Sequence, residues 1–302
     1  MNLLLVVGLI FSLVTVNGLE VFLPFSTVNG IGEEKTQKAI PFVSSTYQTI
    51  PSKKPSAKPF NAEASAAIIY DPASGIRLFE KQPDDKRAVA SLNKLMTALV
   101  IMDSHKPDEI VTVGDIPQLQ PADQKIGISE GEKFKLIDLL RALLIHSAND
   151  AANALAIHDS GSIEAFATKM NIKAQEWDLK NSTYANPSGL DDPKQTSTAN
   201  NLLVITNILM QNQTFKDIVR TSSAKITSIE GKNYNLITTN KLLTQNGVAG
   251  VKTGFTLNAG QCLITYAERQ GKKIVTVVLD SPDRFQESKN MIDWAFNNYI
   301  WQ

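Results

Sequence analysis

The segment ASLNKLMT, residues 90–97, places a serine and a lysine three positions apart at the start of an apolar stretch. Apolar side chains recur at the i, i+3, i+4 and i+7 spacing of a helix with one buried face, at positions 92, 95, 96, 99 and 100. Residues three apart are neighbours on a helix, so we expect Lys94 beside Ser91. A partly desolvated lysine has a lowered pKa and can take the serine proton. The free N–H groups of a helix start favour the developing negative charge, so the pair predicts a nucleophile that needs no histidine.

Ser-x-x-Lys is too short a pattern to carry chemistry alone. It recurs at Ser222 and Lys225, in RTSSAKITS, where no apolar helical face lies behind it. We interpret that copy as chance. The assignment of Ser91 therefore depends on whether further elements of the same chemistry accompany it.

Two further elements follow downstream. HSAND supplies a Ser-x-Asn element, Ser147 and Asn149, after the long helix expected to begin near Phe134. GVKTGFT supplies a Lys-Thr-Gly triplet at residues 252–254, which occurs once in the chain. Another Ser-x-Asn, at residues 288–290, falls inside the amphipathic pattern of the last helix. Ser-x-x-Lys, Ser-x-Asn and Lys-Thr-Gly in this order form the pattern of penicillin-binding proteins and class A β-lactamases.

The surrounding sequence predicts the elements that position these residues. Two short apolar runs flank a turn composition at residues 71–75 and predict a β-hairpin within 65–81. The pattern is mainly helical from 91 to about 210. Strands and a last amphipathic helix then follow, at residues 250–256, 261–269, 273–280 and 285–300. Strands at both ends with helices between them predict an α+β architecture, one antiparallel sheet built from both chain ends plus a helical lobe.

The N-terminal residues differ in composition from the rest. Residues 1–18 form an uncharged apolar run typical of a secretory signal peptide. Because the apolar stretch continues beyond it, an uncleaved anchor over residues 1–25 is the alternative. Residues 26–61 are rich in Ser, Thr, Pro and Lys without a period and predict a flexible tether, and 62–302 then form the folded domain. Both interpretations predict an exported, periplasmic or extracytoplasmic protein, membrane-associated through its N-terminus in the anchor case.

Bulk composition excludes several classes of function. The 302 residues are 43% apolar and 20% charged, as in ordinary globular proteins. A formal net charge of zero gives no electrostatic case for nucleic acid as a partner. Cys262 is the single cysteine, so neither an intrachain disulfide nor a thiolate metal cluster is expected. The three histidines lack ligand-like spacing, so we expect no metal and no other cofactor.

Four segments together resemble a known family. ASLNKLMTALV, HSANDAANALA, YANPSGL and VKTGFTLNAGQCLI are similar to the D-alanyl-D-alanine carboxypeptidases among the low-molecular-mass penicillin-binding proteins, which are serine peptidases of peptidoglycan maturation. The resemblance covers about residue 62 to the C-terminus. It implies a β-lactamase/transpeptidase-like fold, peptidoglycan stem peptides as substrates and β-lactam antibiotics as inhibitors. It also implies that Ser91 is the acylated nucleophile and Lys94 its general base.

The same resemblance implies roles for the other motif residues. Ser147 is a candidate proton relay to the leaving amine, and Asn149 holds the substrate backbone. Lys252 and Thr253 face the terminal carboxylate of the substrate, while Gly254 lets the substrate lie against its strand.

Three more implications concern charge. The backbone N–H groups of Ser91 and Phe255 would form the oxyanion hole. Arg284, in SPDRFQES, matches an arginine that the family places near the substrate carboxylate. Lys252 would add like-charge repulsion to desolvation, and both favour the neutral form of Lys94.

The chain also departs from the family, and other activities stay open. Ser188 stands in NPSGL where the family commonly has a histidine, which leaves the role of that loop open. A DD-endopeptidase that cuts peptidoglycan crosslinks would share every motif. A class A β-lactamase would need a glutamate to position its deacylating water, for which Glu176 is the candidate.

Two alternatives come from outside the family. A Ser-His-Asp hydrolase could draw on His146 or His158, but adjacent residues point in different directions on a helix and no Gly-x-Ser-x-Gly elbow occurs. A non-catalytic wall-binding module would not require all three motifs intact. We expect Trp294 and Trp301 to pack the last helix rather than to stack on glycan.

Overall fold

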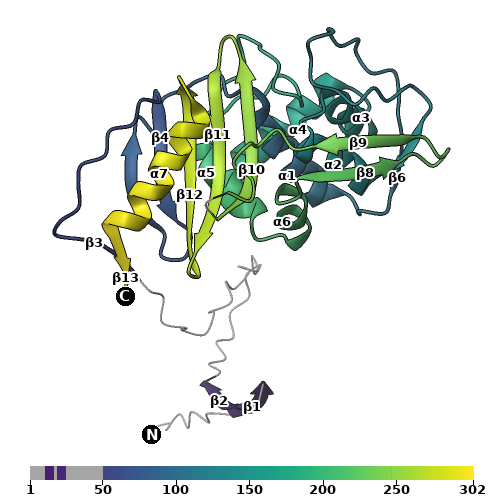
Figure 1. Ribbon diagram of the computed structural model, residues 1–302. Coiled ribbons are helices and arrows are strands. Elements are labelled where there is room, and N and C mark those ends of the chain that lie inside the picture. Colours follow the sequence, from purple (N-terminus) through teal and green to yellow (C-terminus); the bar gives the residue numbers. More distant parts are fainter. Residues whose placement is uncertain (1–10, 17–18, 25–49, 246) are drawn as a thin grey trace, which may run out of the picture. The chain divides into compact units, whose positions relative to one another are not determined.

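The computed structural model describes residues 11–16, 19–24, 50–245 and 247–302 (Figure 1). It divides into two units, residues 1–46 and 47–302. The first contains an antiparallel pair of strands, β1 (Phe11–Val16) and β2 (Leu19–Pro24). Most of the predicted signal peptide, and the predicted tether up to residue 49, lie outside the described residues. Among the helices of the described part, none has the length and apolar character needed to cross a membrane.

A five-stranded antiparallel sheet organises the second unit and confirms the predicted α+β architecture. Its strands, in spatial order, are β10 (Val248–Thr256), β11 (Gly260–Arg269), β12 (Lys272–Ser281), β4 (Ala66–Asp71) and β5 (Ile76–Lys81). The two ends of the folded unit meet where β12 pairs with β4, with Leu279 opposite Ala66. The predicted hairpin and the three predicted C-terminal strands are therefore present in one sheet.

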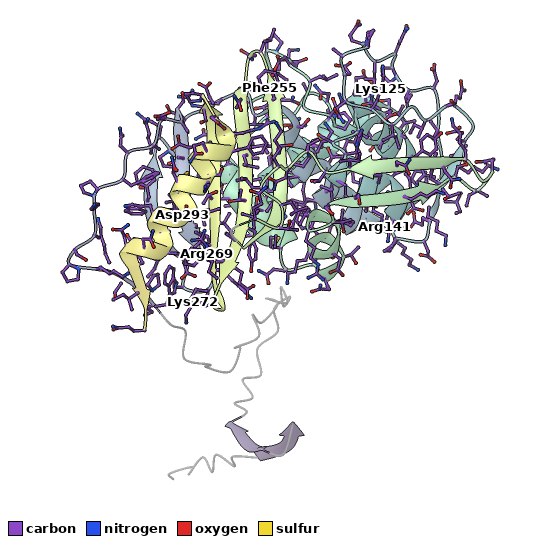
Figure 2. All side chains as sticks on the ribbon, viewed as in Figure 1. Lys125, Arg141, Phe255, Arg269, Lys272 and Asp293 are labelled. Carbon is purple, nitrogen blue, oxygen red and sulfur yellow. The ribbon has the colours of Figure 1, made fainter. Side chains whose placement is uncertain are left out.

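Each face of the sheet is covered by helix. Alternate residues of β12 enter different cores: Val275 and Val277 pack toward the helical lobe, and Ile274 and Val278 toward the C-terminal helix. Both sets are fully buried, which explains why β12 reads as a nearly continuous apolar run. The C-terminal helix α7 (Arg284–Asn298) lies across the sheet in Figure 1. Arg269 of β11 and Asp293 of α7 form an ion pair of 2.6 Å across this interface (Figure 2).

The helical lobe lies between β5 and β10 in the sequence. It contains a short 3-10 helix η1 (Ala90–Asn93) and the helices α1 (Lys94–Ser104), α2 (Leu136–Ile145), α3 (Asn149–Ser160), α4 (Ile163–Glu176), α5 (Ala199–Leu209) and α6 (Gln213–Val219). Capping fixes several ends: Gly161 ends α3 with φ of 78°, and Ser162 Oγ accepts from Ala165 N to begin α4. Helices α1 and α3 contact each other.

Two small two-stranded sheets in this region were not predicted. One pairs β6 (Ile110–Thr112) with β7 (Lys133–Lys135), and the other pairs β8 (Ser223–Thr227) with β9 (Asn233–Ile237). The second carries the spare Ser-x-x-Lys pattern, whose Ser222 and Lys225 are both exposed. Because Lys225 is in a strand, the helical neighbourhood that the pattern requires is absent there.

Residues 50–61, which belong to the predicted tether, pack against the folded unit. Strand β3 (Pro51–Lys53) pairs antiparallel with β13 (Tyr299–Trp301). Phe60 packs edge-on against Phe79, with ring centroids 5.1 Å apart, and also against Trp294. The indole N–H groups of both C-terminal tryptophans donate within the fold, Trp294 to the carbonyl of Lys58 and Trp301 to Asp71. The tryptophans therefore pack the last helix and strand, as predicted.

Phe60→Ala tests whether residues 50–61 belong to the fold. Removing a half-buried aromatic ring from this cluster should lower the free energy of unfolding by about 2 kcal/mol, which is below the roughly 3–5 kcal/mol of a fully buried aromatic ring. Urea denaturation measures it. The matched control is Ser56→Ala, an exposed position in the same segment, which should change stability by less than about 0.5 kcal/mol. Equal stability of wild type and Phe60→Ala would mean that this segment is a tether and does not belong to the fold.

Candidate active site

Ser91 lies on η1, at the start of the α1 segment, in a cleft of about 520 Å³. The preceding residue, Ala90, has φ of 48°, a conformation that costs a non-glycine residue roughly 1–3 kcal/mol. Two glycines press on this turn. A Cβ at Gly189 would lie 2.1 Å from the carbonyl oxygen of Ala90, and a Cβ at Gly254 would lie 2.8 Å from that of Val89. The turn that presents Ser91 is thus held between two close backbone contacts.

Gly254, which we expect to let the substrate lie against its strand, also makes a close contact within the fold. Its missing side chain would point at the η1 backbone, 3.2 Å from Leu92 N, and not into open space. Glycine is needed here because β10 packs against the turn that carries Ser91. The carbonyl of Gly254 also accepts from Arg284 Nη1 at 2.6 Å.

Lys94 is fully buried and its amine meets three oxygen atoms. Nζ lies 2.9 Å from Ser91 Oγ and 2.6 Å from Asn149 Oδ1, and it also contacts the carbonyl oxygen of Ser188. The amide oxygen of Asn149 and the carbonyl of Ser188 can only accept hydrogens. A neutral amine has two N–H groups, which these two acceptors use, so its lone pair is left for the Ser91 hydroxyl.

The electrostatics of the cleft favour that neutral form. Burial, followed by repulsion from Lys252, lowers the pKa of Lys94 well below its usual value. Asp150 and Asp123 act in the opposite direction but more weakly. The expected base is therefore placed against the expected nucleophile, with both the hydrogen bonding and the charge balance that proton transfer from serine requires.

The loop at residues 186–188 is bound to η1 and α1 through three successive carbonyl groups. Asn93 Nδ2 donates to the first, Thr97 Oγ1 to the second and Lys94 Nζ to the third. The hydroxyl of Ser188 instead bonds to Asn186 Oδ1 at 3.0 Å. The contact of Ser188 with Lys94 is thus made by its backbone carbonyl, which a different side chain at this position would also supply.

Ser147 and Lys252 form the opposite wall. Ser147 lies between α2 and α3 with φ of 62°, again a strained conformation for a residue with a side chain. Lys252 Nζ is 2.8 Å from Ser147 Oγ and 3.1 Å from the carbonyl of Thr253. Burial, and then repulsion from Arg284, lowers the pKa of Lys252 to about 7. A proton can therefore leave or join this pair near neutral pH.

The remaining predicted residues line the cleft mouth. Figure 2 shows Phe255 at the end of β10, where its side chain is exposed. Arg284, at the start of α7, is half-buried and its Nε has no hydrogen-bond partner among the described residues. The sequence-predicted residues that line the cleft are Ser91, Ser147, Asn149, Thr253, Gly254, Phe255 and Arg284. Lys94 and Lys252 lie just behind these residues.

Several cleft residues were missed by sequence reasoning. Thr239 Oγ1 is 2.5 Å from Thr253 Oγ1, so it fixes the hydroxyl of the Lys-Thr-Gly triplet. Asp123 and Gln124 belong to a loop that crosses the cleft edge. Asp150 holds that loop, because its carboxylate accepts from three consecutive backbone N–H groups, those of residues 126–128. Neither the loop nor Thr239 carries a motif or a period, so no signal in the sequence marks them.

The rival catalytic groups are elsewhere. Glu176, the candidate for a β-lactamase-type water, forms an ion pair of 2.7 Å with Lys173 and does not line the cleft. His146 faces Gln124 at 2.9 Å and the carbonyl of Ile237 at 3.1 Å, so its ring nitrogens do not contact the neighbouring Ser147. The arrangement provides a Ser-Lys pair and not a Ser-His pair.

Lys252→Met tests the charge balance through stability. The pKa of Lys252 is about 7 in the folded protein and 10.5 as its ordinary value. Between these values the unfolded chain keeps the proton that the folded protein has lost, so the wild type gains stability as pH rises through this window and not below it. The free energy of unfolding of wild type relative to Lys252→Met should rise by up to about 1.4 kcal/mol per pH unit.

Urea denaturation at about pH 6, 8 and 10 measures this difference. Lys225→Met is the control, because the side chain of Lys225 on β8 is exposed and pays no desolvation. A Lys252→Met difference that stays flat with pH would mean that burial does not displace the proton.

Comparison with known proteins agrees with this geometry. A family model described as D-alanyl-D-alanine carboxypeptidase matches residues 52–283. The D-alanyl-D-alanine carboxypeptidase DacF of Bacillus subtilis is 31% identical over 245 residues, which are 78% of this chain and 63% of DacF. A D-alanyl-D-alanine endopeptidase of Pseudomonas aeruginosa is 30% identical over 227 residues, 72% of this chain and 71% of that protein.

A solved structure gives the same fold. Penicillin-binding protein D2 from Listeria monocytogenes in its ampicillin-bound form superposes with a TM-score of 0.68 at 29% identity, covering 79% of this chain and all of that one. The chain spans just over three fifths of the length of the first carboxypeptidases that it matches. The matched region contains the Ser91–Lys94 pair, the Ser147–Asn149 wall and the strand of residues 252–254. The chain therefore belongs to the D-alanyl-D-alanine carboxypeptidase family of serine peptidases.

Proposed function

We propose that this chain is a serine DD-peptidase that removes the terminal D-alanine from peptidoglycan stem pentapeptides through an acyl-enzyme on Ser91. The observation that carries the proposal is the environment of Lys94. Asn149 Oδ1 and the carbonyl of Ser188 can only accept hydrogen bonds, so they take the two N–H groups of the neutral amine. The lone pair of the amine is then left facing Ser91 Oγ. This is the arrangement of a nucleophile with its base in hydrogen-bond contact.

In acylation, Ser91 Oγ attacks the carbonyl carbon of the D-Ala–D-Ala bond while Lys94 takes the hydroxyl proton. The carbonyl oxygen becomes an oxyanion, which the backbone N–H groups of Ser91 and Phe255 would stabilise. The C–N bond then breaks, and the proton taken up by Lys94 passes by way of Ser147 to the departing amine, which returns Lys94 to its neutral form. Water cleaves the resulting ester, with Lys94 again as the base, and returns Ser91 to its hydroxyl form.

The substrate carboxylate supplies recognition. Lys252, Thr253 and Arg284 gather hydrogen-bond donors and positive charge on one wall of the cleft. Charge-assisted hydrogen bonds are about twice as strong as neutral ones. Arg284 Nε, buried without a partner among the described residues, is a donor that such a carboxylate could use. A β-lactam carries a carboxylate beside its reactive amide, so we propose that it acylates Ser91 in the same way.

Cleavage of peptidoglycan crosslinks is the second candidate. Relatives named as endopeptidases match this chain about as well as those named as carboxypeptidases, at 30% against 31% identity. The two reactions share the serine and the acyl group, and differ in how much of the substrate lies on the leaving-group side. The preference for carboxypeptidase over endopeptidase therefore rests on the carboxypeptidase-like YANPSGL and SPDRFQES segments.

The location of the reaction is part of the proposal. Peptidoglycan lies outside the cytoplasm, and the uncharged apolar run at residues 1–18 fits export as a signal peptide, or as an anchor over residues 1–25. The folded peptidase would then occupy residues 50–302 outside the cytoplasm, with no cofactor required by the steps above.

Labelled penicillin should acylate Ser91, located by mass spectrometry of the adduct. Ser91→Ala should abolish labelling without changing the thermal unfolding midpoint. Lys94→Ala should slow acylation by about a hundredfold or more, the lower scale of general-base catalysis. Ser222→Ala, which removes the serine of the spare Ser-x-x-Lys pattern, should label like wild type. Labelling that survives Ser91→Ala would overturn the assignment of the nucleophile.

Purified muropeptides distinguish the two activities. The protein should release free D-alanine from pentapeptide monomers and leave crosslinked dimers intact, as followed by chromatography. Ser91→Ala serves as the blank. Conversion of dimers to monomers without release of D-alanine would replace carboxypeptidase by endopeptidase, while leaving Ser91 as the nucleophile.

A further inference from the structure

A second cluster of chemically competent side chains lies at the far end of the helices that form the active site. Helix α1 begins at Lys94 and is capped at its C-terminus by His105. Helix α3 begins at Asn149, and His158 lies in its last turn. Glu109, just before β6, completes the cluster. We propose that His105, Glu109 and His158 form a binding site for a divalent transition-metal ion, with Zn²⁺ as the reference ion.

The ligand atoms are already near metal-binding distances. One nitrogen or oxygen from each of the three residues lies within 4.8 Å of the others. His105 Nδ1 is 2.8 Å, and His158 Nε2 is 3.8 Å, from Glu109 Oε2. Ligands of a tetrahedral zinc site at 2.0–2.2 Å from the metal are about 3.3 Å apart. The two observed separations lie on either side of that value, each within about half an ångström of it.

Neighbouring groups fix two of the ligands in orientation. His105 Nε2 is 2.9 Å from Asp159 Oδ1, whose side chain is 1% exposed and is also bound by Lys169 and Ser160. A metal-binding histidine typically donates its other ring N–H to such a carboxylate. The second oxygen of Glu109, Oε1, accepts from the backbone N–H of Lys106 at 2.7 Å, so Oε2 is the oxygen left for the cluster.

This orientation creates a place for a cation. When Nε2–H of His105 donates to Asp159, Nδ1 turns its lone pair toward Glu109 Oε2, which is also an acceptor. Two acceptors stay 2.8 Å apart only when a hydrogen or a metal ion lies between them. The C-terminal ends of α1 and α3, near His105 and His158, add partial negative charge that favours a cation.

The chemistry of the ligands selects the class of ion. Two imidazoles and one carboxylate suit Zn²⁺, Ni²⁺ or Cu²⁺ and not Ca²⁺ or Mg²⁺, which prefer oxygen ligands alone. The side chains of His105, His158 and Glu109 are 17%, 25% and 37% exposed, so an ion can enter from solvent. Three protein ligands leave a coordination position for water.

A bound ion would join the C-terminal ends of two helices whose N-terminal ends position the base. Lys94 and Asn149 are bonded at one end of the α1–α3 pair, and His105 and His158 would share a metal at the other. The helices of 11 and 12 residues place the two sites roughly 16 Å apart. The ion's expected effect is therefore on the stability of this helix pair and not on the reacting atoms.

Isothermal titration of the full chain, freed of metal by chelator and dialysis, with ZnCl₂ tests the proposal. Wild type should bind one ion per chain. His158→Gln should weaken binding at least tenfold, and it should fold, because no hydrogen bond of the His158 side chain is found in the described part of the chain. His146→Gln, which removes the histidine outside the cluster, is the matched control and should bind like wild type.

Thermal unfolding supplies an independent readout. Zn²⁺ should raise the unfolding midpoint of wild type and of His146→Gln in a concentration-dependent way, since the ion binds only the folded state, and excess chelator should reverse the shift. The midpoint of His158→Gln should not respond. The proposal is overturned if wild type binds no stoichiometric ion, or if binding and the midpoint shift survive His158→Gln. Penicillin labelling of Ser91 is a separate measurement, so failure here leaves the proposed peptidase activity untouched.

Discussion

The burial of one amine governs the construction of this site. Lys94 is inaccessible to solvent, so its nitrogen must find all its partners within the protein: Asn149 Oδ1 and the Ser188 carbonyl accept its two N–H groups, and Ser91 Oγ meets its lone pair. An unsatisfied buried polar group costs several kcal/mol. These three partners of the amine come from a helix start, a loop and the η1 turn, so the three segments must converge on one point. The close contacts of Gly189 and Gly254 with the η1 backbone are what permit that convergence.

The charge of Lys94 is then set without an ion pair between this amine and a carboxylate of the described residues. A carboxylate in direct contact would hold the amine protonated. Asp150 is the carboxylate that raises the pKa of Lys94 most, but its oxygens accept hydrogen bonds from the N–H groups of residues 126–128. Lys252 supplies repulsion from across the cleft. The fall of the Lys252 pKa to about 7, caused by burial and then by repulsion from Arg284, corresponds to about 5 kcal/mol against its charged form. Two desolvated lysines, with no carboxylate bonded to either in the described part of the chain, make a site in which both amines lose their protons more readily than in water.

The sequence predicted the parts of the site that depend on local spacing. Ser91 and Lys94 are adjacent because three residues make about one helical turn, and the triplet at 252–254 lies on β10, within the strand predicted over residues 250–256. Backbone contributions could not be predicted this way: the carbonyl of Ser188 and the strained φ of Ser147 depend on how distant segments pack. The same limit explains the missed β3–β13 pair, since a three-residue strand has too few residues to show a period.

The histidines also show that spacing in the sequence does not reveal which residues become neighbours through helix packing. His105 and His158 are far apart in the sequence, so no short spacing between two histidines marks a metal motif. They become neighbours because α1 and α3 pack side by side in the same direction, which is itself required for Lys94 and Asn149 to meet. Once the two helix starts are fixed by the catalytic contact, helices of similar length must bring their ends together as well. The cluster at the far end therefore follows from the geometry of the active site. The carboxylate of Glu109, together with the two imidazoles, determines which ions the cluster can bind.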